Sequence, residues 1–129
     1  MRHLTRSFAV GALHRGRQVE QFLGGFEHEG RQALRWIALG PDRQGITIFL
    51  SEVEDAGTTT YSAIDNFPPI DPGDETWGKV IATKSTPEEA LDLAESELGA
   101  RPDRWVNEAV VCSEYHDYKM AAQDELPTP

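Results

Sequence analysis

Apolar and polar residues alternate along much of this chain, with the two-residue period that places successive side chains on opposite faces of a β-strand. The alternation is clearest over residues 32–39 and 46–53, and the segment 40–45 between them is rich in residues that favour turns. These two strands are expected to form a hairpin. Residues 32–39 are apolar on both faces, which is typical of a central strand covered on both sides. Further strands are predicted over residues 7–13, 18–23, 59–64, 77–84 and 109–118.

One segment, about residues 86–98, has the pattern of an amphipathic helix. Thr86 is a typical N-cap, Pro87 suits the first helical position, and Glu89 completes a capping box with Thr86. Gly99 follows where a helix commonly ends in a left-handed residue. The expected buried stripe recurs at helical spacing and consists of Ala90, Leu91, Ala94 and Leu98.

The order of these elements, mostly strands followed by one helix and a final strand, indicates an α+β fold. We predict a single domain over residues 1–120, with an antiparallel sheet of about six to seven strands and one main helix packed on one face. A length of 129 residues suits one domain. Residues 121–129 are predicted to form a flexible C-terminal tail.

The cysteine count and the hydropathy pattern bear on cellular location. Cys112 is the single cysteine, so no intramolecular disulfide is possible, and a reducing compartment is the simplest interpretation. No apolar run has the length of a signal-peptide core or of a membrane-spanning helix. A cytoplasmic protein that does not enter membranes is therefore expected.

Charge is distributed unevenly along the chain. The sequence contains 12 Lys and Arg against 22 Asp and Glu, a formal charge of −10. Residues 1–64 contain seven basic and seven acidic residues, whereas residues 65–129 contain five basic and fifteen acidic residues. Direct binding to nucleic acid needs clustered basic residues, which the acidic half lacks, so a basic protein is the complementary partner. Alternatively, the negative charge only keeps the protein soluble.

The predicted helix carries a first candidate binding surface, its acidic face. Glu88, Asp92 and Glu95 share one side of the helix, and no Lys or Arg lies between residues 85 and 100. Like charges at this spacing destabilise a helix by about 0.2–0.5 kcal/mol per pair, so local stability does not explain them. A basic partner explains them, and a solvated helix face is the alternative.

The loop over residues 65–75 is a second candidate surface. Three prolines stiffen the segment 68–72, which reduces the entropy lost on docking. The acidic residues do not have the spacing of an EF-hand, so a calcium site is not expected. The alternative is an ordinary connection whose apolar residues cap the sheet. The loop residues considered for partner binding are Phe67, Asp71, Asp74 and Glu75, followed by Trp77.

A third cluster of reactive side chains lies at residues 112–118. If this segment is a strand, Cys112 and His116 lie about 13 Å apart along it, too far for a nucleophile and its base. A helix would bring them together, but the tyrosines and preceding valines favour a strand. Glu114, His116 and Asp117 suggest an alternative, a metal-dependent hydrolase that would need remote ligands.

Together these features favour a small, acidic, non-enzymatic module that occludes a basic surface of a partner protein. Toxin-immunity proteins and inhibitors act in this way, and the acidic surface would also suit imitation of nucleic-acid phosphates. No catalytic residue, metal ion or cofactor is expected, and the protein is predicted to be a monomer or homodimer. The alternatives are the hydrolase above and a structural homodimer subunit. The predicted partner-binding residues are Glu88, Asp92, Glu95, Asp71, Asp74, Glu75, Phe67, Trp77 and Tyr115.

Overall fold

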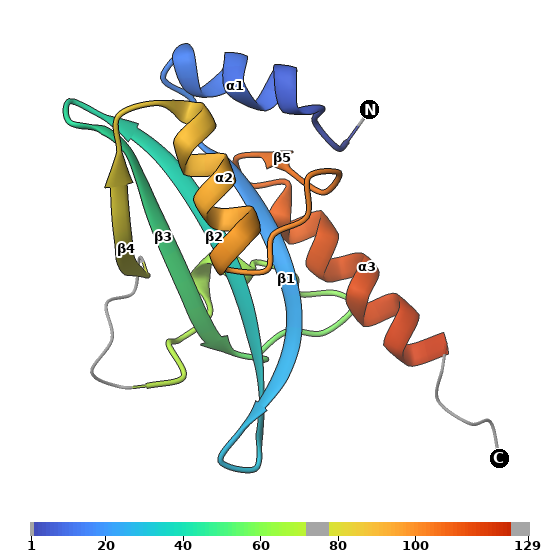
Figure 1. Ribbon diagram of the computed structural model, residues 1–129. Coiled ribbons are helices and arrows are strands. Elements are labelled where there is room, and N and C mark those ends of the chain that lie inside the picture. The colour runs from blue at the N-terminus through green and yellow to red at the C-terminus, as the bar shows by residue number, and fades with distance from the viewer. Residues whose placement is uncertain (1, 72–77, 125–129) are drawn as a thin grey trace, which may run out of the picture.

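The computed structural model describes residues 2–71 and 78–124, which form a single α+β domain (Figure 1). One five-stranded antiparallel sheet has the strand order β4-β3-β2-β1-β5. Three α-helices and one 3-10 turn pack against it. In chain order the elements are α1 (Arg6–His14), β1 (Val19–His28), β2 (Arg31–Asp42), β3 (Gly45–Glu54), η1 (Ile64–Asn66), β4 (Lys79–Lys84), α2 (Pro87–Glu97), β5 (Val106–Asn107) and α3 (Val111–Asp124).

The hairpin of β2 and β3 confirms the strongest prediction from the sequence. Its register runs from Ala33 opposite Glu54 to Asp42 opposite Gly45. β1 pairs along the other side of β2 and has an irregularity between Phe22 and Gly24. Gly24 has a φ of 106°, a backbone conformation that glycine adopts readily, so the strand continues past this bulge.

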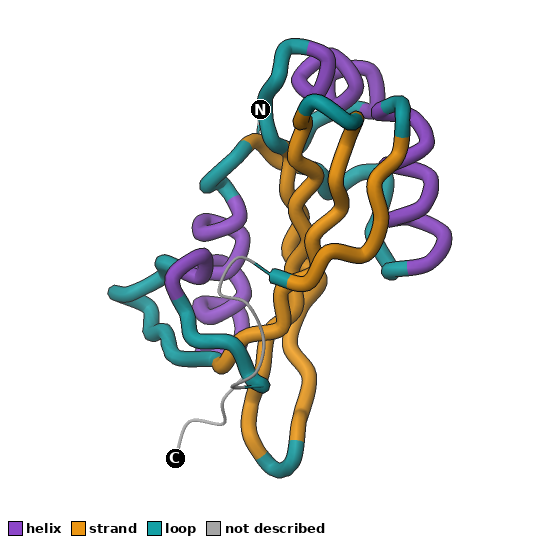
Figure 2. Tube along the Cα trace, turned by 90° about the vertical axis from the view of Figure 1, so that its left-hand side faces the viewer, coloured by secondary structure: helices purple, strands orange, loops and turns teal. Residues whose placement is uncertain are grey.

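Helices cover both faces of the sheet, as Figure 2 shows. The prediction that β2 is covered on both sides is therefore confirmed, whereas the prediction of one helix on one face was incomplete. On one face, α1 and α2 enclose a core that includes Ala9, Ala12, Leu13, Ile37, Leu39, Ile48, Leu91 and Trp105. On the other, α3 and η1 enclose Leu34, Trp36, Ala38, Val53, Ile64, Phe67, Val111 and Tyr115.

The predicted strand over residues 7–13 is wrong, because this segment is helix α1. Its buried residues Ala9, Ala12 and Leu13 have the spacing of one helix face. Thr5 caps the helix, since its side-chain oxygen accepts a hydrogen bond from the Phe8 N–H. The weak alternation of small apolar residues was compatible with both periods, and packing on the sheet selects the helix.

The predicted strand over residues 109–118 is also wrong, because α3 occupies residues 111–124. Val111 and Tyr115 are buried one helical turn apart, and Tyr118 packs against the same core. Pairing with β1 is limited to Val106 and Asn107. Ala109 then has a φ of 73°, which turns the chain out of the sheet before the helix.

The remaining predictions are corrected in smaller ways. The predicted strand 59–64 is wrong: that segment contributes only an isolated bridge between Thr58 and Tyr61. The predicted six to seven strands thus become five. Within the predicted strand 77–84, β4 covers residues 79–84, and position 77 lies outside the described residues. α3 includes residues 121–124 of the predicted tail, whereas residues 125–129 are not described.

The predicted helix over residues 86–98 is confirmed as α2. Thr86 accepts a hydrogen bond from the Glu89 N–H at 3.2 Å, and Gly99 has a φ of 82°. Across the described ranges, none of the helices combines the length and apolar character that a membrane crossing requires.

Because residues 111–124 form a helix, removing the hydroxyl group from each of two tyrosines in α3 is expected to change the stability of the protein by different amounts. The hydroxyl of Tyr115 donates to Asp55 Oδ1 at 2.5 Å inside the core, so Tyr115→Phe leaves a buried carboxylate with one fewer partner. We expect the free energy of unfolding to fall by about 1–3 kcal/mol. Tyr118→Phe is the control, because the structure records no hydrogen bond from its hydroxyl to any described residue, and should cost less than about 0.5 kcal/mol. Urea denaturation followed by circular dichroism measures both, and equal losses would contradict this placement.

Candidate functional site

The predicted acidic face of α2 has a basic partner within the chain itself. Arg6 of α1 donates to Asp92 Oδ1 at 2.9 Å and to the backbone oxygen of Glu88 at 3.4 Å, and it lies 3.9 Å from Glu95 Oε1. The indole N–H of Trp105 donates to Glu95 Oε2 at 3.0 Å. These contacts offset the repulsion among the carboxylates, so the acidic face does not require an external partner for its stability.

The residues predicted in the proline-rich loop are dispersed. Phe67 and Tyr115 were predicted as anchors for a partner, but both are buried in the core beside α3, with ring centroids 5.2 Å apart. Asp71 is exposed. Asp74, Glu75 and Trp77 lie outside the described residues.

Two of the three residues of the alternative hydrolase, Glu114 and Asp117, share Arg2 as an ion-pair partner. Glu114 is buried and accepts from Arg2 at 3.0 Å and from His3 Nε2 at 2.6 Å. Asp117 also pairs with Arg2, whose guanidinium lowers the pKa of that carboxyl. His116 lies 3.8 Å from Asp117 on the helix surface. No three or more His, Cys, Asp or Glu side chains within the described ranges are grouped as a metal site requires.

Cys112 occurs one helical turn before His116, the arrangement that would suit a nucleophile and base. Its sulfur instead lies 3.5 Å from Asp65 Oδ1, and burial raises the pKa of the thiol. A raised pKa keeps the sulfur protonated, so Cys112 has the character of a packing residue.

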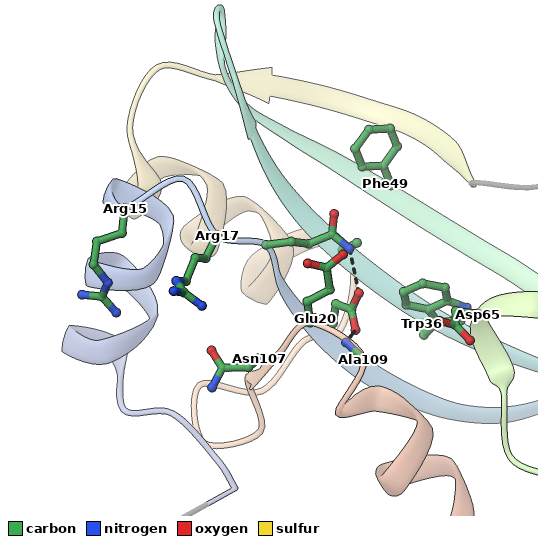
Figure 3. A pocket seen from close by; sticks show the side chains of 11 residues that line it. Arg15, Arg17, Glu20, Trp36, Phe49, Asp65, Asn107 and Ala109 are labelled. Carbon is green, nitrogen blue, oxygen red and sulfur yellow. Dashed lines mark hydrogen bonds between the residues drawn. The ribbon is translucent and has the colours of Figure 1, made fainter.

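A groove lies on the α3 face of the sheet. It has a volume of about 1080 Å³ and lies between the turn after α1, the sheet, and the segment that leads into α3 (Figure 3). Its lining residues are Arg15, Arg17, Gln18, Glu20, Trp36, Ala38, Phe49, Asp65, Asn107, Glu108 and Ala109.

Two exposed arginines form one end of this groove. Gly16, with a φ of 80°, ends α1 in a Schellman motif in which the Arg17 N–H donates to the Ala12 oxygen and the Gly16 N–H donates to the Leu13 oxygen. This turn places Arg15 and Arg17 on either side of the glycine, at the groove (Figure 3). Neither guanidinium has a carboxylate within salt-bridge distance among the described residues, although the chain is strongly acidic.

The other end of the groove is aromatic. Trp36 and Phe49 line it from β2 and β3, and Figure 3 shows Asp65 at the same end as Trp36. Trp36 is 8% exposed, and its buried indole N–H has no hydrogen-bond acceptor in the described part of the chain. An unpaired buried donor costs about 1–3 kcal/mol, and this N–H belongs to a side chain that lines the groove.

Carboxylates occupy the middle of the groove. Glu20 is buried and accepts hydrogen bonds from Gln18 Nε2 at 2.7 Å and from the Ala109 N–H at 2.9 Å. Burial raises the pKa of Glu20, and the negative charges of Glu108 and Asp65 act in the same direction. The left-handed backbone of Ala109 directs its N–H toward Glu20, so the unusual φ and the buried carboxylate belong to one arrangement.

The raised pKa of Glu20 predicts a pH-dependent stability. When protonated, a carboxyl whose pKa is raised by folding stabilises the folded state relative to its ionised form. This contribution is complete below the pKa in the unfolded chain, 4.5, and is lost as the pH rises through the pKa in the folded chain. Glu20→Gln keeps an acceptor for Ala109 and does not ionise, so its stability relative to the wild type should increase between about pH 4 and pH 7. Urea denaturation at several pH values measures this difference, and a difference that stays constant would contradict it.

Arg15, Arg17, Trp36 and Phe49, at the two ends of the groove, were not predicted as functional from the sequence, whereas Asp65 belongs to the loop 65–75 that was predicted as a candidate surface. The sequence feature that could have indicated the arginine end is the segment from Arg15 to Arg17, in which two basic residues flank a glycine. The same segment is equally typical of an exposed turn. Trp36 reads as a core residue, and it is one, apart from its unpaired nitrogen. Comparisons with protein-family models, with curated proteins and with solved structures found no match for this chain.

Proposed function

We propose that this chain is a binding protein that holds a small organic anion in the groove between Arg15, Arg17 and Trp36. The observation that carries this proposal is the joint occurrence of two unpaired guanidinium groups and one buried, unpaired indole N–H in a single concavity. Among the described residues, none supplies a carboxylate within salt-bridge distance of these guanidinium groups or an acceptor for this N–H. An anionic ligand with a hydrogen-bond acceptor supplies both.

The charge distribution supports an anion at the arginine end. Five other arginines have carboxylate partners, such as Arg31 with Glu54 at 2.6 Å and Arg35 with Glu52 at 2.5 Å, whereas Arg43 and Arg104 have none within salt-bridge distance among the described residues. Arg15 and Arg17 remain unpaired beside the groove despite an excess of acidic residues. Guanidinium groups bind carboxylate and phosphate well, because several N–H donors meet two oxygens at once.

The size and the lining of the groove support an organic ligand. A volume of about 1080 Å³ is at the upper end of the range for small-molecule sites, which is about 300–1,000 Å³. Trp36, Ala38 and Phe49 provide an apolar wall against which a flat group can pack. An inorganic ion would use the arginines and leave this wall empty.

Substitution of the arginines tests the proposal. Aromatic carboxylates and aryl phosphates at millimolar concentration serve as probes, with binding followed by ligand-observed NMR. We expect some of them to bind, and Arg15→Gln with Arg17→Gln to weaken that binding about 10-fold or more through loss of charge-assisted hydrogen bonds. Arg43→Gln removes an exposed charge at the β2–β3 turn and is the matched control. Absence of binding by every probe, or equal binding by the double variant, would refute the proposal.

Binding of a basic partner protein is a second candidate function, favoured by the exposure of the acidic face. The side chains of Asp92 and Glu88 are 67% and 50% exposed, and Arg6 is the only arginine or lysine that forms an ion pair with this face within the described part of the chain. The acidic face therefore keeps an excess of negative charge after its internal pairing. Such a surface accelerates association with a basic partner and makes that association sensitive to salt.

A matched pair of charge variants tests the second candidate. A tagged chain is used to capture proteins from its native lysate at low salt and at about 0.5 M salt, where charges are strongly screened. Capture of one basic protein that is lost at high salt, and lost in Glu88→Gln with Asp92→Gln, is the expected result. Glu27→Gln with Glu29→Gln changes the net charge equally at the β1–β2 tip and should retain capture. Capture that falls equally in both variants would contradict a specific role for α2.

A further inference from the structure

The charges of the groove are arranged in an order that specifies its ligand further. Positive charge from Arg15 and Arg17 lies at one end, Glu20 lies between, and Trp36 with Asp65 lies at the other end (Figure 3). Glu108 also lines the groove, together with its chain neighbours Asn107 and Ala109. A ligand that matches this order carries a negative group, then a positive group, then an apolar ring.

From this order, and resting on the proposed function, we infer that the ligand is an aromatic α-amino acid bound as its zwitterion. Its carboxylate would pair with the arginines, its ammonium group would meet the groove carboxylates, and its ring would pack beside Trp36 and Phe49. A ring that carries a hydroxyl, as in tyrosine, matches the far end best.

The groove carboxylates argue against a ligand that is only an anion. Glu20, Glu108 and Asp65 all line the groove, and the negative charges of Glu108 and Asp65 act to raise the pKa of Glu20. A negative group of the ligand placed among these carboxylates would be repelled, whereas an ammonium group of the ligand would be attracted.

The aromatic end has both a donor and an acceptor for a ring hydroxyl. The Trp36 N–H is buried without an acceptor, and Asp65 is an exposed carboxylate at the same end of the groove. A phenolic hydroxyl accepts one hydrogen bond and donates another, so it can use both groups at once. Phe49, which is half-buried, adds an apolar surface beside the ring.

The two ends of the groove lie several residues apart along the chain direction of β1, so a small inorganic ion cannot contact both. Trp36 is paired with Phe22 of β1, and Arg17 precedes Phe22 by five residues.

Four related probes separate the contributions of the three ligand groups. L-tyrosine carries all of them; N-acetyl-L-tyrosine lacks the positive charge, tyramine lacks the carboxylate, and L-phenylalanine lacks the hydroxyl. Binding is measured by ligand-observed NMR and by calorimetry at pH 7. We expect L-tyrosine to bind most tightly, with N-acetyl-L-tyrosine and tyramine each about 10-fold weaker or more, and L-phenylalanine several-fold weaker, as the loss of a charged or neutral hydrogen bond implies.

Variants assign each preference to its residue. Arg17→Gln should reduce the advantage of L-tyrosine over tyramine, and Glu108→Gln should reduce its advantage over N-acetyl-L-tyrosine. Asp65→Asn and Trp36→Phe should reduce its advantage over L-phenylalanine. Arg43→Gln should change none of these ratios. Circular dichroism establishes that each variant is folded, and Asp65→Asn at the surface keeps the test of the aromatic end valid if Trp36→Phe is unstable.

The outcomes distinguish this inference from the proposed function. If N-acetyl-L-tyrosine binds as tightly as L-tyrosine, and binding still depends on Arg17, the groove takes simple organic anions and the zwitterion inference is refuted alone. If tyramine binds as tightly as L-tyrosine and Arg17→Gln has no effect, the anion site is refuted, and the inference with it. If neither L-tyrosine nor any of the aromatic carboxylates and phosphates binds, both fall.

Discussion

Burial of strand β2 on both of its faces is the constraint on which the rest of this fold depends. Leu34, Trp36 and Ala38 face α3, and Ile37 and Leu39 face α1 and α2. A strand whose side chains are apolar on both faces exposes a large apolar surface to water unless a layer covers each face, and this exposure is unfavourable. The N-terminal segment and the C-terminal segment supply those layers as helices, and β1 and β3 flank β2 to satisfy its backbone.

Incomplete coverage of one face produces the groove. α3 begins at Val111 and packs on β1 through Tyr115 and Tyr118, beside η1. The part of the same face that carries Glu20 and Phe49 extends beyond the start of this helix, where the turn after α1 and the segment 107–109 form only the walls. The concavity therefore arises where the sheet is longer than the helix that covers it. The buried Trp36 nitrogen lies at this boundary between core and groove.

Long-range ion pairs reduce the charge imbalance that the chain shows along its sequence. Arg2 and Arg6, from the electrically balanced half, pair with Glu114, Asp117 and Asp92 of the acidic half. Asp55 in turn pairs with Lys119 at 2.8 Å. The groove lies on the α3 face of the sheet, and α2 with its acidic side chains packs on the opposite face (Figures 1 and 2).

The sequence by itself determined the elements whose signals are local or redundant. Thr86, Pro87 and Gly99 delimit α2, and the two-sided apolar pattern of residues 32–39 identified the central strand together with its hairpin. Such patterns are reliable because capping, turn chemistry and burial all favour the same backbone. The α+β class followed from their order.

Only the tertiary structure decided the helical state of residues 6–14 and 111–124, and the groove that depends on both. Those segments contain small apolar residues, or valines and tyrosines, whose local preferences are weak enough for packing to override them. The groove brings together Arg17, Trp36 and Glu108 from three distant parts of the chain. No periodicity or spacing relates such residues, because their proximity is created by the pairing of strands and the placement of helices on the sheet.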